Sequence, residues 1–182
     1  FRHYIEAGGG FVGVHSVTGT ERKWDWFKMM VGETFTWHAK FQPFSVINID
    51  PAHPSLKGVP TIWTKEDECY FGAELYPGIK TLLMHDVSTL DQGQKDLITK
   101  HKGIYGNYFP AAWTQHFQGG HIWVTTLGHA KENYQEPVYL NHLWQGINYI
   151  AGQVKVNVLA LMYLTRLVLP GMIQRRRGKI LN

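Results

Sequence analysis

The sequence predicts an α/β domain built on a mostly parallel sheet. Short apolar runs alternate with segments whose apolar residues recur at spacings of three and four, and this alternation of strands with helices is typical of parallel sheets. Two of the runs, residues 11–14 and 120–127, end in the same way: His15 follows the first, and Gly128 and His129 follow the second. Ligands in open α/β sheets bind beyond the carboxyl ends of strands, so the two histidines mark the edge at which we expect a site.

In the first part of the chain, the spacing of apolar residues predicts the elements and glycines mark where they end. Residues 1–7 have the pattern of the end of an amphipathic helix, and three glycines separate it from the strand at 11–14. Residues 21–31 are predicted to be helical because their large apolar side chains share one face, and Gly32 ends the helix.

The later elements follow from alternation and periodicity. Residues 44–50 alternate between apolar and polar side chains, and residues 80–84 form a short apolar run, so both are predicted strands. A polar segment after them holds a short helix that begins at Asp91. The apolar strand at 120–127 follows, and the helix predicted at 139–151 has apolar residues three and four apart.

Composition and charge limit the function classes. The chain has 182 residues, a length that suits one domain, and a formal net charge of +4. Much of the positive excess lies in residues 175–179, and a short basic run of this kind is typical of a solvated helix end rather than of a nucleic-acid-binding face. We therefore expect no nucleic-acid partner.

Cysteine usage and hydropathy predict a location. Cys69 is the single cysteine, so no internal disulfide can form and a reducing, cytoplasmic compartment is expected. The longest apolar stretch, residues 156–172, is interrupted by Asn157, Arg166 and Pro170 and is too short to span a bilayer. We therefore expect no membrane partner.

Three residues are the best candidates for acid–base catalysis. His15 and His129 follow strands, and a histidine titrates near neutral pH. Glu68 is the candidate carboxylate, because apolar surroundings can raise the pKa of a glutamate toward neutrality. The alternative is that His15 and Ser16 only form a turn.

Six further residues are candidates for binding the substrate. An aromatic ring can stack on a sugar ring, although core packing is the alternative for every aromatic residue in this chain. The candidates are Ser16, Trp37, His53, Asp67, Tyr70 and Trp113.

A resident metal or other cofactor is not expected. The ten histidines include no pair at the spacing of two ligands on one helix turn, and no cysteine cluster accompanies them. A metal site would have to be assembled from strand ends, with His15, His53 and His129 as nitrogen ligands and Glu68 as the carboxylate. Of the remaining histidines, His3, His101 and His142 are expected on the surface.

Five motifs in order resemble the trehalose-utilisation family, the ThuA-like domains. They are Gly8-Gly9-Gly10-Phe11-Val12-Gly13-Val14-His15-Ser16, His53-Pro54, Asp67-Glu68-Cys69-Tyr70, Pro110-Ala111-Ala112-Trp113 and Thr125-Thr126-Leu127-Gly128-His129. The resemblance covers residues 1–152. It implies a flavodoxin-like three-layer sandwich with a mostly parallel sheet, related to the class I glutamine amidotransferases. It also implies a role in sugar utilisation.

The chain departs from the amidotransferases at the nucleophile. In those enzymes a cysteine follows a central strand, and by fold analogy His15 stands near that position while His129 stands near the position of their histidine. Cys69 lies in a different motif, so amidotransferase chemistry is not expected. Whether the chain is an enzyme of another kind is left open by the sequence.

Two departures from the family concern the ends of the chain. The strand–helix units that normally precede the triple glycine are absent, so the domain of residues 1–152 is expected to be partial. Residues 153–182 resemble a helix–strand segment of short-chain dehydrogenases, without the Tyr-x-x-x-Lys pair or the cofactor loop. Either this tail replaces a missing sheet element, or two polypeptides are represented in one sequence.

Two functions follow from these observations. The first is a carbohydrate-processing or carbohydrate-binding domain with a small-molecule sugar as its partner, in which His15, Glu68 and His129 lie around one substrate. The alternative is a non-catalytic α/β scaffold or assembly fragment. It would form a homo-oligomer through the helix predicted at 156–172.

Overall fold

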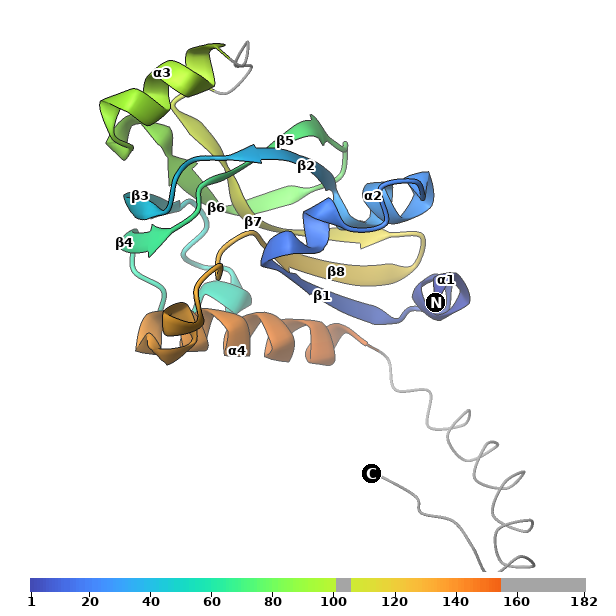
Figure 1. The fold of residues 1–182 in the computed structure, drawn as a ribbon. Coiled ribbons are helices and arrows are strands. Elements are labelled where there is room, and N and C mark those ends of the chain that lie inside the picture. The colour runs from blue at the N-terminus through green and yellow to red at the C-terminus, as the bar shows by residue number, and fades with distance from the viewer. Residues whose placement is uncertain (101–105, 155–182) are drawn as a thin grey trace, which may run out of the picture.

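The computed structural model describes residues 1–100 and 106–154 (Figure 1). In these residues the chain forms a mixed α/β fold with a curled six-stranded sheet, a separate two-stranded ribbon and four α-helices. The helices are α1 (Arg2–Glu6), α2 (Asp25–Val31), α3 (Gln92–Lys100) and α4 (Pro137–Gln153). The short 3-10 helices are η1 (His15–Gly19), η2 (Pro54–Leu56), η3 (Val87–Thr89) and η4 (Lys131–Gln135).

The large sheet has the strand order β1-β8-β7-β6-β3-β4. Its strands are β1 (Gly10–Val14), β3 (Gln42–Asn48), β4 (Ile62–Asp67), β6 (Lys80–Asp86), β7 (Tyr108–Phe117) and β8 (Gly120–Thr125). The remaining two strands, β2 (Glu33–His38) and β5 (Tyr70–Leu75), pair antiparallel as the ribbon. This ribbon lies beside the large sheet, above β7 in Figure 1.

The direction of the strands differs from the prediction of a mostly parallel sheet. Within the described residues only β1 and β8 pair in parallel, with Val12 opposite Trp123, whereas the other neighbours in the sheet are antiparallel. The prediction was wrong here because β4, β5 and β7 lack a clear sequence pattern, and it is these strands that return the chain in the opposite direction without a crossover helix. The described residues therefore do not confirm a flavodoxin-like sandwich.

Two apolar clusters cover opposite faces of the β1–β8 pair. Side chains alternate along β8, so Trp123 points into a cluster with Tyr139 and Ile150 of α4 and its neighbour Val124 points into a cluster with Phe27 of α2. Figure 1 shows α4 and α2 on the two sides of these strands. The two clusters pack against both faces of β1 and β8. They therefore fix the positions of the strand ends, from which His15 and the segment leading to His129 continue.

Two fully buried histidines flank the end of β8. His85 Nε2 lies 3.1 Å from the Thr126 hydroxyl, and His142 Nε2 lies 3.1 Å from the Thr125 hydroxyl. Burial lowers the pKa of each imidazole to about 3, and Lys65 adds to the effect at His142. His142 is thus a core residue, contrary to the expectation from sequence, while His101 lies outside the described residues.

We expect these two histidines to cause acid unfolding. Above pH 6.5 both are neutral in the folded and unfolded chain, but below it only the unfolded chain takes up the protons. The free energy of unfolding should therefore fall by about 1.4 kcal/mol per pH unit for each histidine between about pH 6.5 and 3. Urea unfolding of His142→Gln against pH should show a smaller slope than the wild type, whereas the exposed control His116→Gln should keep the full slope. An unchanged slope in His142→Gln would contradict this account.

The described residues contain no helix that is both long enough and apolar enough to cross a bilayer. The predicted helix at 156–172, its role in oligomer formation, and all but the first two residues of the dehydrogenase-like segment at 153–182 lie outside the described residues. Gln153 itself is the last residue of α4.

Candidate functional site

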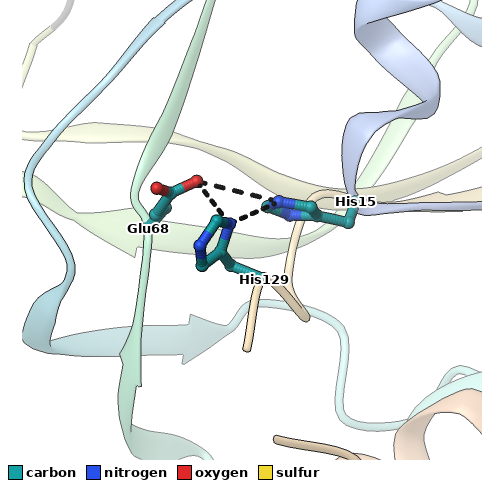
Figure 2. Close-up of side chains that lie close together, drawn as sticks. All are labelled: His15, Glu68 and His129. Atoms are coloured by element: carbon teal, nitrogen blue, oxygen red, sulfur yellow. Dashed lines mark hydrogen bonds and ion pairs between the residues drawn. The ribbon is translucent and has the colours of Figure 1, made fainter. Parts of the chain in front are cut away.

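The candidate site lies where β1 and β8 end side by side, next to the turn between β4 and β5. His15 directly follows β1, His129 lies four residues beyond β8, and Glu68 lies between β4 and β5. Figure 2 shows the three side chains pointing toward one another. Residues that are far apart in the sequence are thus brought together by the parallel pairing of β1 with β8.

His15 is held in one orientation and one tautomer. It has a φ of 49°, in the left-handed region that non-glycine residues rarely adopt, and this turn brings the chain out of β1 into η1. Its Nδ1 lies 2.8 Å from the Thr126 carbonyl oxygen, which can only accept, so Nδ1 carries the proton and Nε2 offers its lone pair. Burial lowers the pKa of His15, against the opposing effects of that carbonyl and of the Asp67 and Glu68 carboxylates. His15 is therefore neutral at pH 7.

The three polar side chains are in direct contact. His129 Nδ1 lies 2.9 Å from Glu68 Oε2 and 3.3 Å from His15 Nε2, and His15 Nε2 lies 3.7 Å from the same Glu68 oxygen (Figure 2). The side chains of His15 and Glu68 are 13% and 10% exposed, whereas that of His129 is 47% exposed. The cluster is therefore shielded on two sides and reaches solvent at His129.

Asp67 ties the two halves of the site together. Its carboxylate, fully buried, accepts backbone N–H bonds from Glu68 at 2.9 Å, from Gly128 at 2.7 Å and from His129 at 3.0 Å. Lys65 Nζ lies 3.5 Å from it and 3.0 Å from Glu136, so the carboxylate charge is balanced. Asp67 was predicted to bind substrate, but in this structure its oxygens contact the backbone. It acts on the site through the residues that it positions.

Gly128 completes the turn after β8. Its φ of 108° is accessible to glycine at no steric cost, and a Cβ at this position would collide with the Tyr139 hydroxyl. The glycine therefore lets the chain turn tightly enough to place His129 beside Glu68.

Tyr70 contacts the cluster, and two residues that were not predicted from the sequence lie beside it: His38 next to Glu68, and Phe35 next to Tyr70. The Tyr70 hydroxyl lies 2.8 Å from His15 Nε2, and burial raises the pKa of this phenol to about 12, so it is the donor in this bond. His38 Nδ1 lies 3.4 Å from the second Glu68 oxygen, and the Phe35 ring packs 4.5 Å from Tyr70 between centroids. Both missed residues lie on β2, whose pairing with β5 could not be read from the sequence.

Two other predicted substrate-binding residues, Trp113 and Trp37, pack with the two apolar core clusters. Trp113 is fully buried among the residues of α2 and donates its indole N–H to the Val31 carbonyl. Trp37 stacks on Phe71 toward the other core cluster.

The two remaining candidates, His53 and Ser16, lie at two of the 3-10 helices. His53 caps η2 through Ser55 and packs its ring against Tyr149 of α4, so it does not join the cluster of His15, Glu68 and His129. Ser16 is exposed in η1, next to His15.

The arrangement supports two kinds of chemistry. A carboxylate in contact with two imidazoles can transfer protons to and from a bound molecule. The same three groups offer ligand atoms that all lie within 4.8 Å of one another, close enough to hold a metal ion. Nucleophilic catalysis by Cys69 is not supported, because the thiol is buried and burial raises its pKa well above the ordinary value.

Two solved structures that are similar to this chain are described as putative ThuA-like proteins. A putative ThuA-like protein from Bacteroides uniformis has a TM-score of 0.68 at 21% identity over 85% of this chain and 63% of its own length. A second putative ThuA-like protein, from Parabacteroides merdae, has a TM-score of 0.61 at 21% identity over 85% of this chain and 65% of its own. A cytoplasmic protein from Salmonella typhimurium reaches 0.51 at 14% identity over 82% of this chain and 58% of its own. The chain thus spans less than two thirds of the length of these proteins.

The family comparison covers most of the chain. No curated protein sequence matches it. The model of the family described as "ThuA: Trehalose utilisation" matches residues 1–150, which include the three clustered residues. The match ends before the tail, so the resemblance of residues 153–182 to short-chain dehydrogenases stays a prediction, as does the relationship to glutamine amidotransferases. The chain belongs to the trehalose-utilisation (ThuA) family.

Proposed function

We propose that the chain is a carbohydrate-processing or carbohydrate-binding domain whose proton-transfer site consists of His15, Glu68 and His129. The observation that carries this proposal is the contact of all three groups around one point, with Glu68 Oε2 at 2.9 Å from one imidazole and 3.7 Å from the other. Membership of the trehalose-utilisation family supports a sugar as the ligand class.

The three residues have different roles in this proposal. His129, half-exposed, meets the sugar hydroxyl and passes its proton to or from Glu68. The Thr126 carbonyl keeps His15 Nε2 free of a proton, and this nitrogen can exchange the hydrogen bond that it accepts from Tyr70 for one from a sugar hydroxyl. The Tyr70 hydroxyl donates toward the cluster and supplies a further hydrogen-bonding group for the substrate.

Aromatic rings around the cluster suit a sugar ring. Tyr70 and Phe35 lie on one side, and the Phe41 ring centroid lies 5.9 Å from that of His129. Aromatic faces pack against the C–H faces of sugars while the hydroxyls are bound by polar groups. We assign the stacking wall to these rings, since Trp113 is committed to the core.

The sequence left a non-catalytic scaffold as the alternative, and one observation favours it. Leu140, Trp144 and Ile147 are exposed by 46%, 60% and 47% along one side of α4. Apolar side chains gathered on a helix face are typical of association surfaces. Such a domain would bind no sugar.

Sugar binding and turnover test the proposal. The purified chain should be titrated with trehalose and glucose in the presence of a chelator, with the thermal midpoint and product formation by NMR as readouts. We expect saturating sugar to raise the midpoint by a few degrees, because ligand that binds only the folded chain stabilises it. Glu68→Gln, which keeps the shape and removes the charge, should lower turnover by about 100-fold or more.

A matched control is available two residues away. Glu66 lies on β4 with its side chain exposed, so Glu66→Gln should behave as the wild type in both readouts. A folded wild-type chain that binds neither sugar would contradict the proposal and favour the scaffold.

A further inference from the structure

The spacing of the clustered donor atoms matches the first coordination shell of a metal ion. Zinc binds histidine nitrogen and carboxylate oxygen at about 2.0–2.2 Å, so neighbouring ligand atoms in a tetrahedral or octahedral shell are roughly 3.0–3.5 Å apart. The three distances among His15 Nε2, His129 Nδ1 and Glu68 Oε2 are 2.9, 3.3 and 3.7 Å. An ion can therefore be placed between them with small movements of the half-exposed His129 ring.

His15 already directs a lone pair at the cluster, whereas His129 Nδ1 donates toward Glu68 Oε2 and has to give up that proton when an ion binds. His15 donates Nδ1–H to the Thr126 carbonyl, and this bond leaves Nε2 as the unprotonated nitrogen that faces the other two groups. A histidine ligand whose other ring nitrogen donates to a carbonyl is the usual arrangement around protein-bound metals. The second Glu68 oxygen lies 3.4 Å from His38 Nδ1. Oε2 is the Glu68 oxygen that points into the cluster (Figure 2).

The ligand types select the kind of ion. Two imidazoles and one carboxylate suit zinc and other first-row transition metals, whereas magnesium and calcium take oxygen ligands almost exclusively. Three protein ligands with one side open to solvent are typical of catalytic sites, since structural sites are closed by four. The exposure of His129 provides that open side.

We propose that His15, Glu68 and His129 bind one divalent first-row transition-metal ion, with zinc as the reference ion. Binding of the ion does not depend on the proposed sugar. With the ion in place the two imidazoles are ligands and no longer transfer protons, so the proton transfer proposed above belongs to the ion-free chain, which is the form titrated with a chelator. The Tyr70 hydroxyl, bonded to His15 Nε2 in this structure, has to release that nitrogen when the ion binds.

Calorimetric titration of the full 182-residue chain, stripped with a chelator, tests the inference with Zn²⁺ alone as the probe. We expect one ion per chain with a dissociation constant below about 10 μM, and Mg²⁺ at the same concentrations should give no binding. His15→Ala, Glu68→Gln and His129→Gln should each weaken Zn²⁺ binding by about 100-fold or more. Tyr70→Phe should keep the wild-type affinity or exceed it, because the competing hydroxyl is gone.

The chain offers a matched histidine control. His116 and His121 face each other across β7 and β8 with ring centroids 4.9 Å apart, and this pair could capture Zn²⁺ weakly at the surface. His116→Ala should leave the tight site intact. If His116→Ala abolished binding, or if His15→Ala and His129→Gln both bound as the wild type, the assignment would be overturned.

A spectroscopic measurement on the wild-type chain tests the proposal even if the ligand variants do not fold. Co²⁺ added to the wild-type chain should give intense visible absorption of a four- or five-coordinate nitrogen–oxygen site, and Zn²⁺ should displace it stoichiometrically. A spectrum identical to that of free aqueous Co²⁺ would contradict the proposal. The sugar titration is carried out with a chelator and the metal titration without sugar, so the failure of either proposal can be told from the failure of the other.

Discussion

Replacing Asp67 with alanine is expected to lower the free energy of unfolding by about 3–5 kcal/mol, because it removes one member of a buried charged network. The carboxylate is fully buried, and its loss leaves the backbone N–H groups of Glu68, Gly128 and His129 without their acceptor. Lys65, also buried, would keep only Glu136 as a carboxylate partner. Urea unfolding at pH 7 measures the loss, and the thermal midpoint should fall by roughly 10 °C.

Two further variants show whether the destabilisation by Asp67→Ala exceeds that caused by losing an ordinary capping carboxylate. Asp67→Asn keeps one acceptor oxygen for the Glu68 and His129 amides but turns a donor toward Gly128, so we expect an intermediate loss. Asp86 caps η3 through the Ser88 amide, and Asp86→Ala should cost about 1 kcal/mol. If Asp67→Ala were no more destabilising than Asp86→Ala, the network would not hold the site together.

Replacing Glu33 with glutamine is expected to stabilise the chain at alkaline pH. The Glu33 carboxyl group is buried at the start of β2, and both of its oxygens lack a hydrogen-bond partner among the described residues. Burial raises its pKa from 4.5 to about 8. The folded chain therefore keeps a proton that the unfolded chain releases above pH 4.5, and the free energy of unfolding falls as pH rises through this window.

Glutamine at this position is neutral at every pH and avoids that loss. The difference in unfolding free energy between Glu33→Gln and the wild type should be near zero at pH 4.5 and should grow to about 5 kcal/mol above pH 8. The control is Glu66→Gln, because the Glu66 side chain is exposed on β4; for this variant we expect no increase of the difference with pH. A constant difference from pH 5 to pH 9 would show that Glu33 is ionised in the folded chain.

Together the buried groups set the pH of maximum stability. Glu33 lowers stability as pH rises from 4.5 to about 8, and His85 and His142 lower it as pH falls below 6.5. Because two histidines outweigh one glutamate below pH 6.5, the wild-type maximum should lie near that pH.

Sequence reasoning located the strands that carry a simple pattern and missed those that do not. The apolar runs of β1 and β8 were predicted, and so was their shared ending in histidine. Strand β7 was missed because Pro110 normally argues against a central strand. In the structure Pro110 stands opposite Met84, at the point where the register of β6 and β7 shifts.

The same reasoning selected the clustered residues but not their surroundings. His15, Glu68 and His129 were chosen because of their chemistry and because two of them follow strands. His38 and Phe35 escaped notice because their proximity depends on the ribbon of β2 and β5, a pairing between segments that no local pattern specifies. Asp67 was noticed as a substrate ligand, whereas its buried backbone bonds depend on the turn after β8.

The parallel pairing of β1 with β8 also has a consequence for the time at which the cluster forms. His129 is separated from His15 by 114 residues, and the carbonyl that orients His15 is 111 residues away. Contacts between such distant segments form slowly because a long loop must close first. During synthesis His15 leaves the ribosome well before Thr126 and His129, which follow it by 111 and 114 residues. The cluster of His15, Glu68 and His129 therefore cannot form before His129 has been synthesised.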